Sequence, residues 1–276
     1  GRHRRVARAL RLLTARGPVA TRAPAQRRDD EPAFVLHAYP YRETSLIVEA
    51  FTPGYGRVAM VARGAKRPRS ETRGLLQAFQ PLVLSWAGTG ELKTLLKAEW
   101  RGGLPLPAGS ALLAGFYVNE LLLKLLPRED PHAALFDAYA TALAALAERP
   151  AAAAQAAVLR RFELTLLAEL GYALTLTHEA GGGLPVDPAG RYHYVFDRGP
   201  QRVAANVARE PAAGGPVVRG ATLVALATQA YPDAETAAEA KRLMREVLDH
   251  HLDARQVVSR RIVRDLMALD EEGPQP

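Results

Sequence analysis

A chain of 276 residues with 48% hydrophobic residues is long enough for two domains with a sizeable core. The absence of cysteine excludes disulfides and thiolate metal sites, and the apolar run Leu121–Leu126 is too short to span a membrane. The net charge of +7 divides into +9 over residues 1–28, −3 over 29–31, +5 over 33–101 and −4 over 102–276, so the positive charge is concentrated in the first part of the chain.

Residues 1–32 are rich in Arg, Ala and Pro and contain little apolar surface after Leu13. Such a segment cannot bury enough surface to offset its ordering entropy, so we expect a disordered basic arm, with nonspecific binding of polyanions as a secondary role. Its start is similar to an organelle transit peptide and equally to an upstream extension of a bacterial reading frame.

Residues 33–101 alternate between short β-prone runs and turns. Five short strands in about 70 residues predict an OB-type barrel or a small sandwich. In the last strand Lys93 and Lys97 alternate with Leu92 and Leu96, so we expect the leucines in the core and the lysines at solvent or ligand. The predicted strands are Ala33–Tyr39, Glu43–Thr52, Arg57–Arg63, Gln77–Ala87 and Glu91–Trp100.

The connection after the third strand is strongly basic. From Arg57 to Arg73 six basic residues stand against one acid, Glu71. A charge run of this kind is often a plain solvated surface. Here glycines and a proline interrupt it between two strands, which is typical of small barrels that bind nucleic acids through loops.

Aromatic side chains lie among these basic residues as candidate stacking platforms. For any one of them, burial in the core is the commoner outcome. Tyr41 and Tyr55 lie in turns beside Arg42 and Arg57, so we predict that these two stack on bases. The others are Tyr39, Phe51, Phe79 and Trp86.

Gly102–Pro107 predicts a linker, and helical patterning follows it. Ser110 is the candidate N-cap of the first helix, and Gly171 the candidate C′ residue of the third. Residues 175–210 are Gly/Pro-rich and predicted to be irregular, apart from a short strand at Arg191–Phe196. The predicted helices are Ser110–Leu126, His132–Ala147, Ala151–Leu170, Ala221–Ala230, Ala234–His251 and Ala254–Ala268.

The sequence therefore predicts an α+β protein. An N-terminal five-stranded OB-type β-barrel over residues 33–101 is followed by an α-helical bundle domain over residues 108–269, which contains the irregular insert. Residues 270–276 are expected to fray.

No pattern indicates catalysis. The glycines at 54 and 56 lack the spacing of a dinucleotide fingerprint, and no phosphate-binding GxxxxGK[ST] loop is present. His250 and His251 are adjacent, so we expect surface histidines on different faces of their helix. The remaining candidate metal ligands are too scattered to predict a site: His178, His193, Asp187 and Asp197. We expect no enzyme, no cofactor and no metal.

Short motifs run in order through both predicted domains. They are A-F-V-L-H (33–37), E-T-S-L (43–46), G-R-V (56–58), V-A-R-G-A (61–65), G-E-L-K-T (90–94), Y-V-N-E-L-L (117–122), L-R-R-F-E-L-x-L-L (159–167), L-G-Y (170–172) and S-R (259–260). Over residues 33–267 this series resembles the RecO family of bacterial DNA repair and recombination mediators. Many relatives carry a four-Cys zinc module where this chain has Thr177–Ala180, so we expect no zinc there.

The resemblance implies an OB domain on a helical domain and a role in recombinational repair without nucleotide hydrolysis. It implies binding to single- and double-stranded DNA, annealing of complementary strands and, with RecR, helping RecA replace single-strand-binding protein (SSB). It also implies a cytoplasmic, nucleoid-associated location in a bacterium, with no membrane. We expect DNA to be held by Arg42, Arg57, Arg63, Lys66, Arg67, Arg69, Arg73, Lys93 and Lys97.

SSB proteins end in an acidic tail with an apolar, aromatic-bearing tip. Its receptor needs a cationic clamp beside an apolar pocket. Arg160 and Arg161 are adjacent cations on an otherwise apolar helix, and the candidate pocket walls are Leu159, Phe162 and Leu166. An intrahelical ion pair of Arg160 with Glu163 is the alternative.

Other functional classes remain open from the residues alone. One is an OB-fold protein that binds RNA without sequence preference. Another is an enzyme in which the basic loop holds a phosphorylated substrate. The third is an adaptor that binds only proteins.

Overall fold

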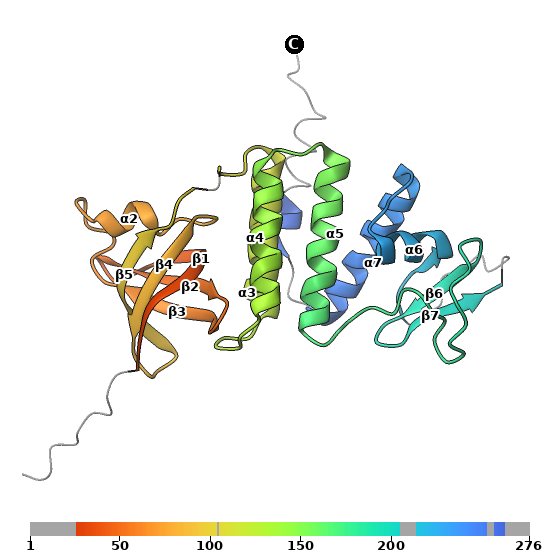
Figure 1. The fold of residues 1–276 in the computed structure, drawn as a ribbon, viewed down its shortest axis with the longest axis horizontal. Helices are drawn as coiled ribbons and strands as arrows, with labels where there is room; N and C mark the ends of the chain where they lie inside the picture. The colour runs from red at the N-terminus through yellow and green to blue at the C-terminus, as the bar shows by residue number, and fades with distance from the viewer. Residues whose placement is uncertain (1–25, 104, 205–213, 253–256, 263–276) are drawn as a thin grey trace, which may run out of the picture.

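A β-barrel, a group of helices and a small β-sheet follow one another along the long axis of the molecule (Figure 1). The computed structural model describes residues 26–103, 105–204, 214–252 and 257–262. The expected arm before residue 26, much of the last predicted helix and the tail 270–276 lie outside the described residues. No helix in the described ranges is both long and apolar enough to cross a membrane.

Five strands form a closed barrel in the order β1-β2-β3-β5-β4, and β4 also pairs with β1. The β3–β5 pair is parallel, whereas the other neighbours are antiparallel. This arrangement confirms the predicted OB-type barrel. The strands are β1 (Arg27–Tyr41), β2 (Ser45–Thr52), β3 (Gly56–Ala62), β4 (Pro81–Ala87) and β5 (Leu92–Trp100).

The first strand begins earlier than its composition suggested. Arg27 and Arg28 pair with Ala87 and Trp86 of β4, and the backbone N–H of Asp30 donates to Ser85 Oγ at 3.0 Å. The prediction of a disordered segment up to residue 32 is therefore wrong over residues 27–32. Ladder hydrogen bonds to β4 order this polar stretch although it buries little apolar surface.

Small and aliphatic side chains fill the barrel interior. They alternate along each strand with outward-facing residues, as the period of two requires. Trp86 is the largest of them and is 2% exposed. The others include Val35, Val48, Ala50, Val58, Met60, Leu82 and Leu84.

Five long helices lie within two residues of their predicted ends, and a short unpredicted helix, α2 (Glu71–Leu75), lies in the basic loop. The predicted cap at Ser110 is wrong, because Gly109 precedes the first helix and Ser110 is its first residue. Gly171 is confirmed: its φ is +85°, and the Tyr172 N–H donates to the Leu167 carbonyl at 2.7 Å. The long helices are α3 (Ser110–Leu125), α4 (Ala133–Ala147), α5 (Ala152–Glu169), α6 (Gly220–Thr228) and α7 (Ala234–His251).

The insert between α5 and α6 is more regular than predicted. The expected strand is present as β6 (Arg191–Val195), and it pairs on both sides, with β7 (Gly199–Val203) and β8 (Val217–Arg219). The sequence concealed β7 because it opens with Gly-Pro and lacks apolar alternation. Pro200 is tolerated there because β7 is an edge strand of this sheet.

One hydrophobic core runs from the outside of the barrel to the small sheet. Side chains on β1 and β2 that point away from the barrel interior meet α3 and α4, and the same cluster continues through α5 and α7 to β6. Its members include Phe34, Leu36, Phe51, Tyr139, Phe162, Met244 and Tyr192. The barrel and the helices are therefore joined by a shared core.

A buried hydrogen-bonded chain crosses this junction. Asn119 of α3 donates through Nδ2 to the Leu36 carbonyl of β1 at 2.9 Å, and the Tyr139 hydroxyl donates to Asn119 Oδ1 at 2.6 Å. Asn119 is 2% exposed and Tyr139 is fully buried. Burial raises the pKa of Tyr139 above its ordinary value, so its hydroxyl stays protonated as the donor.

Replacing Asn119 by Leu should therefore lower the free energy of unfolding by about 2–4 kcal/mol, because two buried polar groups lose their partner. Urea denaturation measures this loss. Gln155→Leu is the matched control: its Nε2 donates to the Ser110 carbonyl at an exposed site, 3.4 Å away, and the change should stay within about 0.5 kcal/mol. Equal losses in the two variants would contradict the importance of the buried chain.

Candidate nucleic-acid interface

The basic loop between β3 and β4 folds against the turn between β1 and β2. The Lys66 N–H donates to the Thr44 carbonyl at 2.9 Å, and Lys66 Nζ lies 3.4 Å from the Arg42 carbonyl. Within the loop, the N–H groups of Arg67, Ser70 and Arg73 each bond to the carbonyl three residues earlier, as from Arg67 to Gly64 at 3.0 Å. These bonds give the loop a defined shape and bring Arg42 to it.

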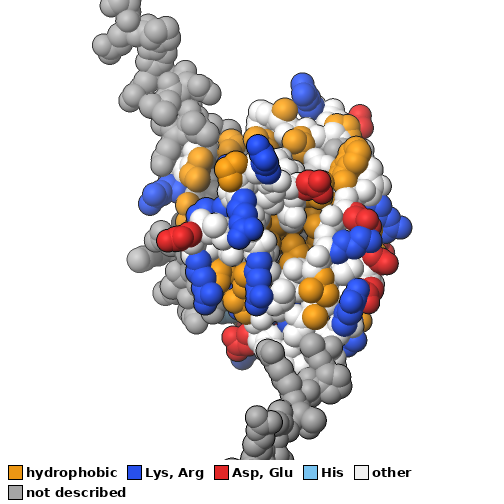
Figure 2. Space-filling model, turned by 90° about the vertical axis from the view of Figure 1, so that its left-hand side faces the viewer, with side chains coloured by type: hydrophobic (Ala, Val, Ile, Leu, Met, Phe, Trp, Pro, Cys, Tyr) orange, Lys and Arg blue, Asp and Glu red, His pale blue; other side chains and the backbone are white. Residues whose placement is uncertain are grey.

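We call the resulting group the basic cluster: Arg42, Arg63, Lys66, Arg67, Arg69 and Arg73. All but the half-buried Lys66 are exposed. Figure 2 faces the barrel end of the molecule and shows Lys and Arg side chains gathered there, with hydrophobic side chains between them. The arrangement is a positive surface suited to phosphate groups.

Arg57 belongs to a different part of the barrel. It is the second residue of β3 whereas Arg63 follows the end of that strand, so at about 3.3 Å per residue the two lie roughly 20 Å apart. The Arg57 side chain is 15% exposed, pairs with Glu49 Oε2 at 3.0 Å and donates to the Leu126 carbonyl at 3.0 Å. It joins the barrel to the end of α3, so little of this side chain is left for contact with DNA.

Lys93 is likewise engaged inside the protein. It is 7% exposed, and its Nζ lies 2.7 Å from both the Gly90 carbonyl and Glu129 Oε1. Leu92 and Leu96 are 40% and 49% exposed, so the prediction that these two leucines face the core is wrong. The acidic partner in the α3–α4 connection offsets part of the cost of burying the ammonium group.

Lys97 remains at the surface but has acidic neighbours. Its ammonium lies 2.9 Å from Glu99 and 3.5 Å from Asp30, and half of the side chain is exposed. The Glu99 hydrogen bond raises the pKa of Lys97. DNA would have to compete with both carboxylates for this cation.

The two tyrosines proposed as stacking platforms are each covered in part by a neighbouring arginine. The Tyr55 ring packs edge-on against Trp86 at 5.4 Å and has the Arg28 guanidinium 5.0 Å from its centroid. Arg42 lies 5.1 Å from the Tyr41 centroid. Phe51, Phe79 and Trp86 are buried, which is the outcome expected as the commoner one for an aromatic residue.

Trp100 is a candidate stacking residue that the sequence did not single out. It ends β5 and is 58% exposed, and its Nε1 donates to Gln80 Oε1 at 3.0 Å. Because β5 runs parallel to β3, its end points the same way as the strand that leads into the basic loop. In the sequence, the place of Trp100 at the end of a predicted strand and next to Arg101 could have indicated this role.

Two domain models of one family match this chain. The model for "Recombination protein O N terminal" matches residues 29–103, and that for "Recombination protein O C terminal" matches residues 107–261. The first match covers nearly the whole barrel, and the second covers the helices and the small sheet.

The chain belongs to the RecO family.

Proteins named DNA repair protein RecO are similar to it over most of their length. That of Aromatoleum aromaticum is 50% identical over 244 residues, which are 88% of this chain and 98% of the relative. That of Dechloromonas aromatica is 50% identical over 241 residues, 87% and 97% of the two chains, and that of Azoarcus sp. is 48% identical over 248 residues, 90% and 100%. The predicted family is confirmed, and this places the chain among DNA repair and recombination proteins.

The helix proposed to clamp the SSB tail, α5, buries one of the two proposed cations. Arg160 is 7% exposed and pairs with Glu163, which also accepts from the Tyr117 hydroxyl at 2.7 Å. Burial alone would lower the pKa of Arg160, but the Glu163 carboxylate holds it above its ordinary value. The alternative, an intrahelical ion pair, is the arrangement observed.

Phe162 is 2% exposed in the shared core, so the prediction that it walls an open pocket is wrong. Leu166 is fully buried in the same core. Arg161 is exposed and Leu159 is half-buried. Only these two of the proposed residues offer surface to a partner.

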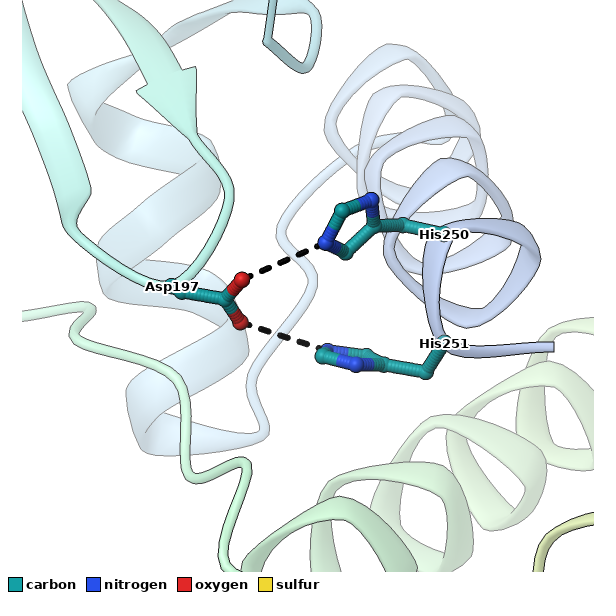
Figure 3. A group of neighbouring side chains, drawn as sticks. All are labelled: Asp197, His250 and His251. Carbon is teal, nitrogen blue, oxygen red and sulfur yellow. Dashed lines mark hydrogen bonds and ion pairs between the residues drawn. The ribbon is translucent and has the colours of Figure 1, made fainter. Parts of the chain in front are cut away.

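The polar side chains of residues 177–180 have partners within the protein. His178 Nδ1 lies 2.9 Å from the Thr177 hydroxyl, and Glu179 accepts from the Tyr192 hydroxyl at 3.2 Å. His250 and His251 were expected to diverge, and that prediction is wrong. Both rings face Asp197, which lies in the turn between β6 and β7 (Figure 3).

Replacing Arg57 by Ala should mainly reduce the stability of the fold. The buried Glu49 would keep only Arg128, which is 42% exposed, as its charged partner, so we expect the free energy of unfolding to fall by about 3–5 kcal/mol. Arg69→Ala, within the exposed basic cluster, should change it by less than about 0.5 kcal/mol. Thermal or urea denaturation compares the two, and similar small effects would show that the Arg57 contacts contribute little.

Proposed function

We propose that this protein binds single- and double-stranded DNA through the basic cluster and anneals complementary strands. With RecR, it helps RecA replace SSB on single-stranded DNA. The observation that carries the proposal is the attachment of the basic loop to the β1–β2 turn, which gathers the cations of two loops on one end of an OB barrel. Membership of a family of DNA repair proteins supports it.

Phosphate contacts suit this surface. Arg and Lys side chains that neutralise phosphates release condensed counterions, and this gain does not depend on base sequence. Tyr41 and Trp100 lie toward the same end as the basic cluster and offer aromatic faces on which single-stranded bases stack. Arg57 and Lys93, which are held in internal ion pairs, are left out of the proposed interface.

Annealing follows from the same charges. Two polyanionic strands repel each other, and a cationic surface that holds one or both lowers this repulsion. Base pairing then drives formation of the duplex. The protein acts in this proposal as a mediator without catalytic turnover, and no nucleotide is consumed.

Reversing three cations of the cluster tests the proposal. In a chain that begins at Gln26, so that the basic arm is removed and β1 stays whole, Lys66→Glu, Arg67→Glu and Arg69→Glu together should weaken binding to all DNA sequences alike. The log–log salt slope on single strands should become less steep by about 2, at about 0.7 per phosphate contact. Fluorescence titration at several salt concentrations measures both, and annealing should fall in parallel.

The matched control reverses three exposed arginines elsewhere, Arg161, Arg191 and Arg198, which gives the same change in net charge. It should leave the salt slope unchanged. If both triple variants lose DNA affinity equally, the protein binds DNA through its overall charge and the basic cluster has no special role.

The acidic tail of SSB would meet the helical domain at Arg161 and Leu159. Arg161→Ala should then weaken binding of a labelled tail peptide without changing affinity for naked DNA. Arg160→Ala should act mainly by destabilising the fold, because it leaves Glu163 buried without its cation. Peptide binding that is unchanged in a folded Arg161→Ala variant would exclude α5 as the tail site.

A further inference from the structure

Three metal-ligating side chains converge where the turn between β6 and β7 meets the end of α7 (Figure 3). Asp197 comes from the turn between β6 and β7, while His250 and His251 end α7. His250 Nε2 lies 3.2 Å from Asp197 Oδ2, and His251 Nε2 lies 3.8 Å from Asp197 Oδ1. The ligand atoms of all three residues lie within 4.8 Å of one another.

These separations suit a single small cation. Nitrogen and oxygen ligands about 2.0–2.1 Å from a tetrahedral Zn²⁺ are roughly 3.3 Å apart, and the two His–Asp distances lie on either side of that value. The separation of 3.8 Å at His251 is too long for a hydrogen bond, so direct bonding to Asp197 does not account for the orientation of that ring.

Aromatic neighbours hold both imidazole rings in place. His251 stacks on Tyr172 with centroids 4.1 Å apart and an interplanar angle of 25°, and His250 stacks on Phe196 at 4.6 Å and 20°. Tyr172 follows α5 and Phe196 follows β6, so the two supports come from separate segments. Ligands held in this way lose little rotamer freedom on binding an ion.

An open coordination position is also available. A cavity of about 310 Å³ adjoins the group, and its lining includes Asp197, His251, Tyr172, Tyr194 and Gly199. A water molecule fits there as a fourth ligand. Three protein ligands with one exchangeable position is a common arrangement for Zn²⁺.

We propose that Asp197, His250 and His251 bind one divalent transition-metal ion, preferably Zn²⁺, which clamps the β6–β7 turn to the end of α7. The competing interpretation is a plain His–Asp ion pair at the surface. The three ligands come from the small sheet and α7, whereas the basic cluster lies on the barrel.

Metal binding to the full-length chain tests the proposal. Zn²⁺ is titrated in competition with a chromophoric chelator, and Co²⁺ is used as a spectroscopic probe of tetrahedral nitrogen and oxygen coordination. We expect one equivalent of metal per chain and a rise in Tm with added Zn²⁺. His250→Ala and Asp197→Asn should each weaken binding by more than about tenfold, since even residues that only support a ligand contribute about 10–100-fold.

His37→Ala is the matched control, because His37 is also an exposed imidazole beside an aromatic ring, 4.3 Å from Tyr39. It should bind metal as the unchanged chain does. His250 and Asp197 are chosen over the more buried His251 because their exposed side chains can be replaced without disturbing the fold, which circular dichroism checks. No stoichiometric binding by the unchanged chain, or equal affinity in His250→Ala and His37→Ala, would overturn the site in favour of the ion pair.

Discussion

The connection between α3 and α4 is docked into one end of the barrel, and the relation between the two parts of the protein depends on it. Gly56, with φ at +63°, lets the backbone of Asp130 approach so closely that a Cβ on residue 56 would lie 1.9 Å from the Asp130 carbonyl oxygen. Beside this contact the buried Glu49 binds Arg57 and Arg128, and the Glu129 N–H donates to the Arg57 carbonyl at 2.9 Å. The barrel end that receives this connection is thereby occupied by protein.

The two ends of the barrel consequently carry basic residues with different roles. At the docked end Arg57 forms an ion pair with the buried Glu49, and Lys93 forms one with Glu129 of the α3–α4 connection. These ion pairs help to hold the barrel and the helices together. At the other end the basic cluster has backbone partners that shape its loop and leaves most of its side chains exposed. The net charge of the barrel does not distinguish these two ends, but the degree of burial of each basic side chain does.

Periodicity and turn residues predicted most of the fold because they report local geometry. The barrel strands, five long helices and the turn at Gly171 all follow from patterns within a few residues. The predictions failed where residues distant in sequence determine the structure. Pairing with β4 orders Arg27 and Arg28, and the ion pair with Glu129 holds Lys93 inside the protein. Pairing with β6 forms a strand from a segment that opens with Gly-Pro. The meeting of Asp197 with His250 and His251 was hidden for the same reason, since about fifty residues separate the turn from the helix end in the sequence.

The core that passes from Phe34 on the barrel to Tyr192 on the small sheet joins the outer face of the barrel to the helices and the small sheet. Packed interiors transmit strain, so a packing defect anywhere in this shared core also weakens the support of the barrel strands that contribute to it. Damage to packing near Tyr192 would then lower the amount of folded barrel in the cell, although no residue there approaches the basic cluster in sequence. Inherited changes that impair repair through this protein need not map to its DNA-binding surface, and many would be found among residues whose only task is to fill space.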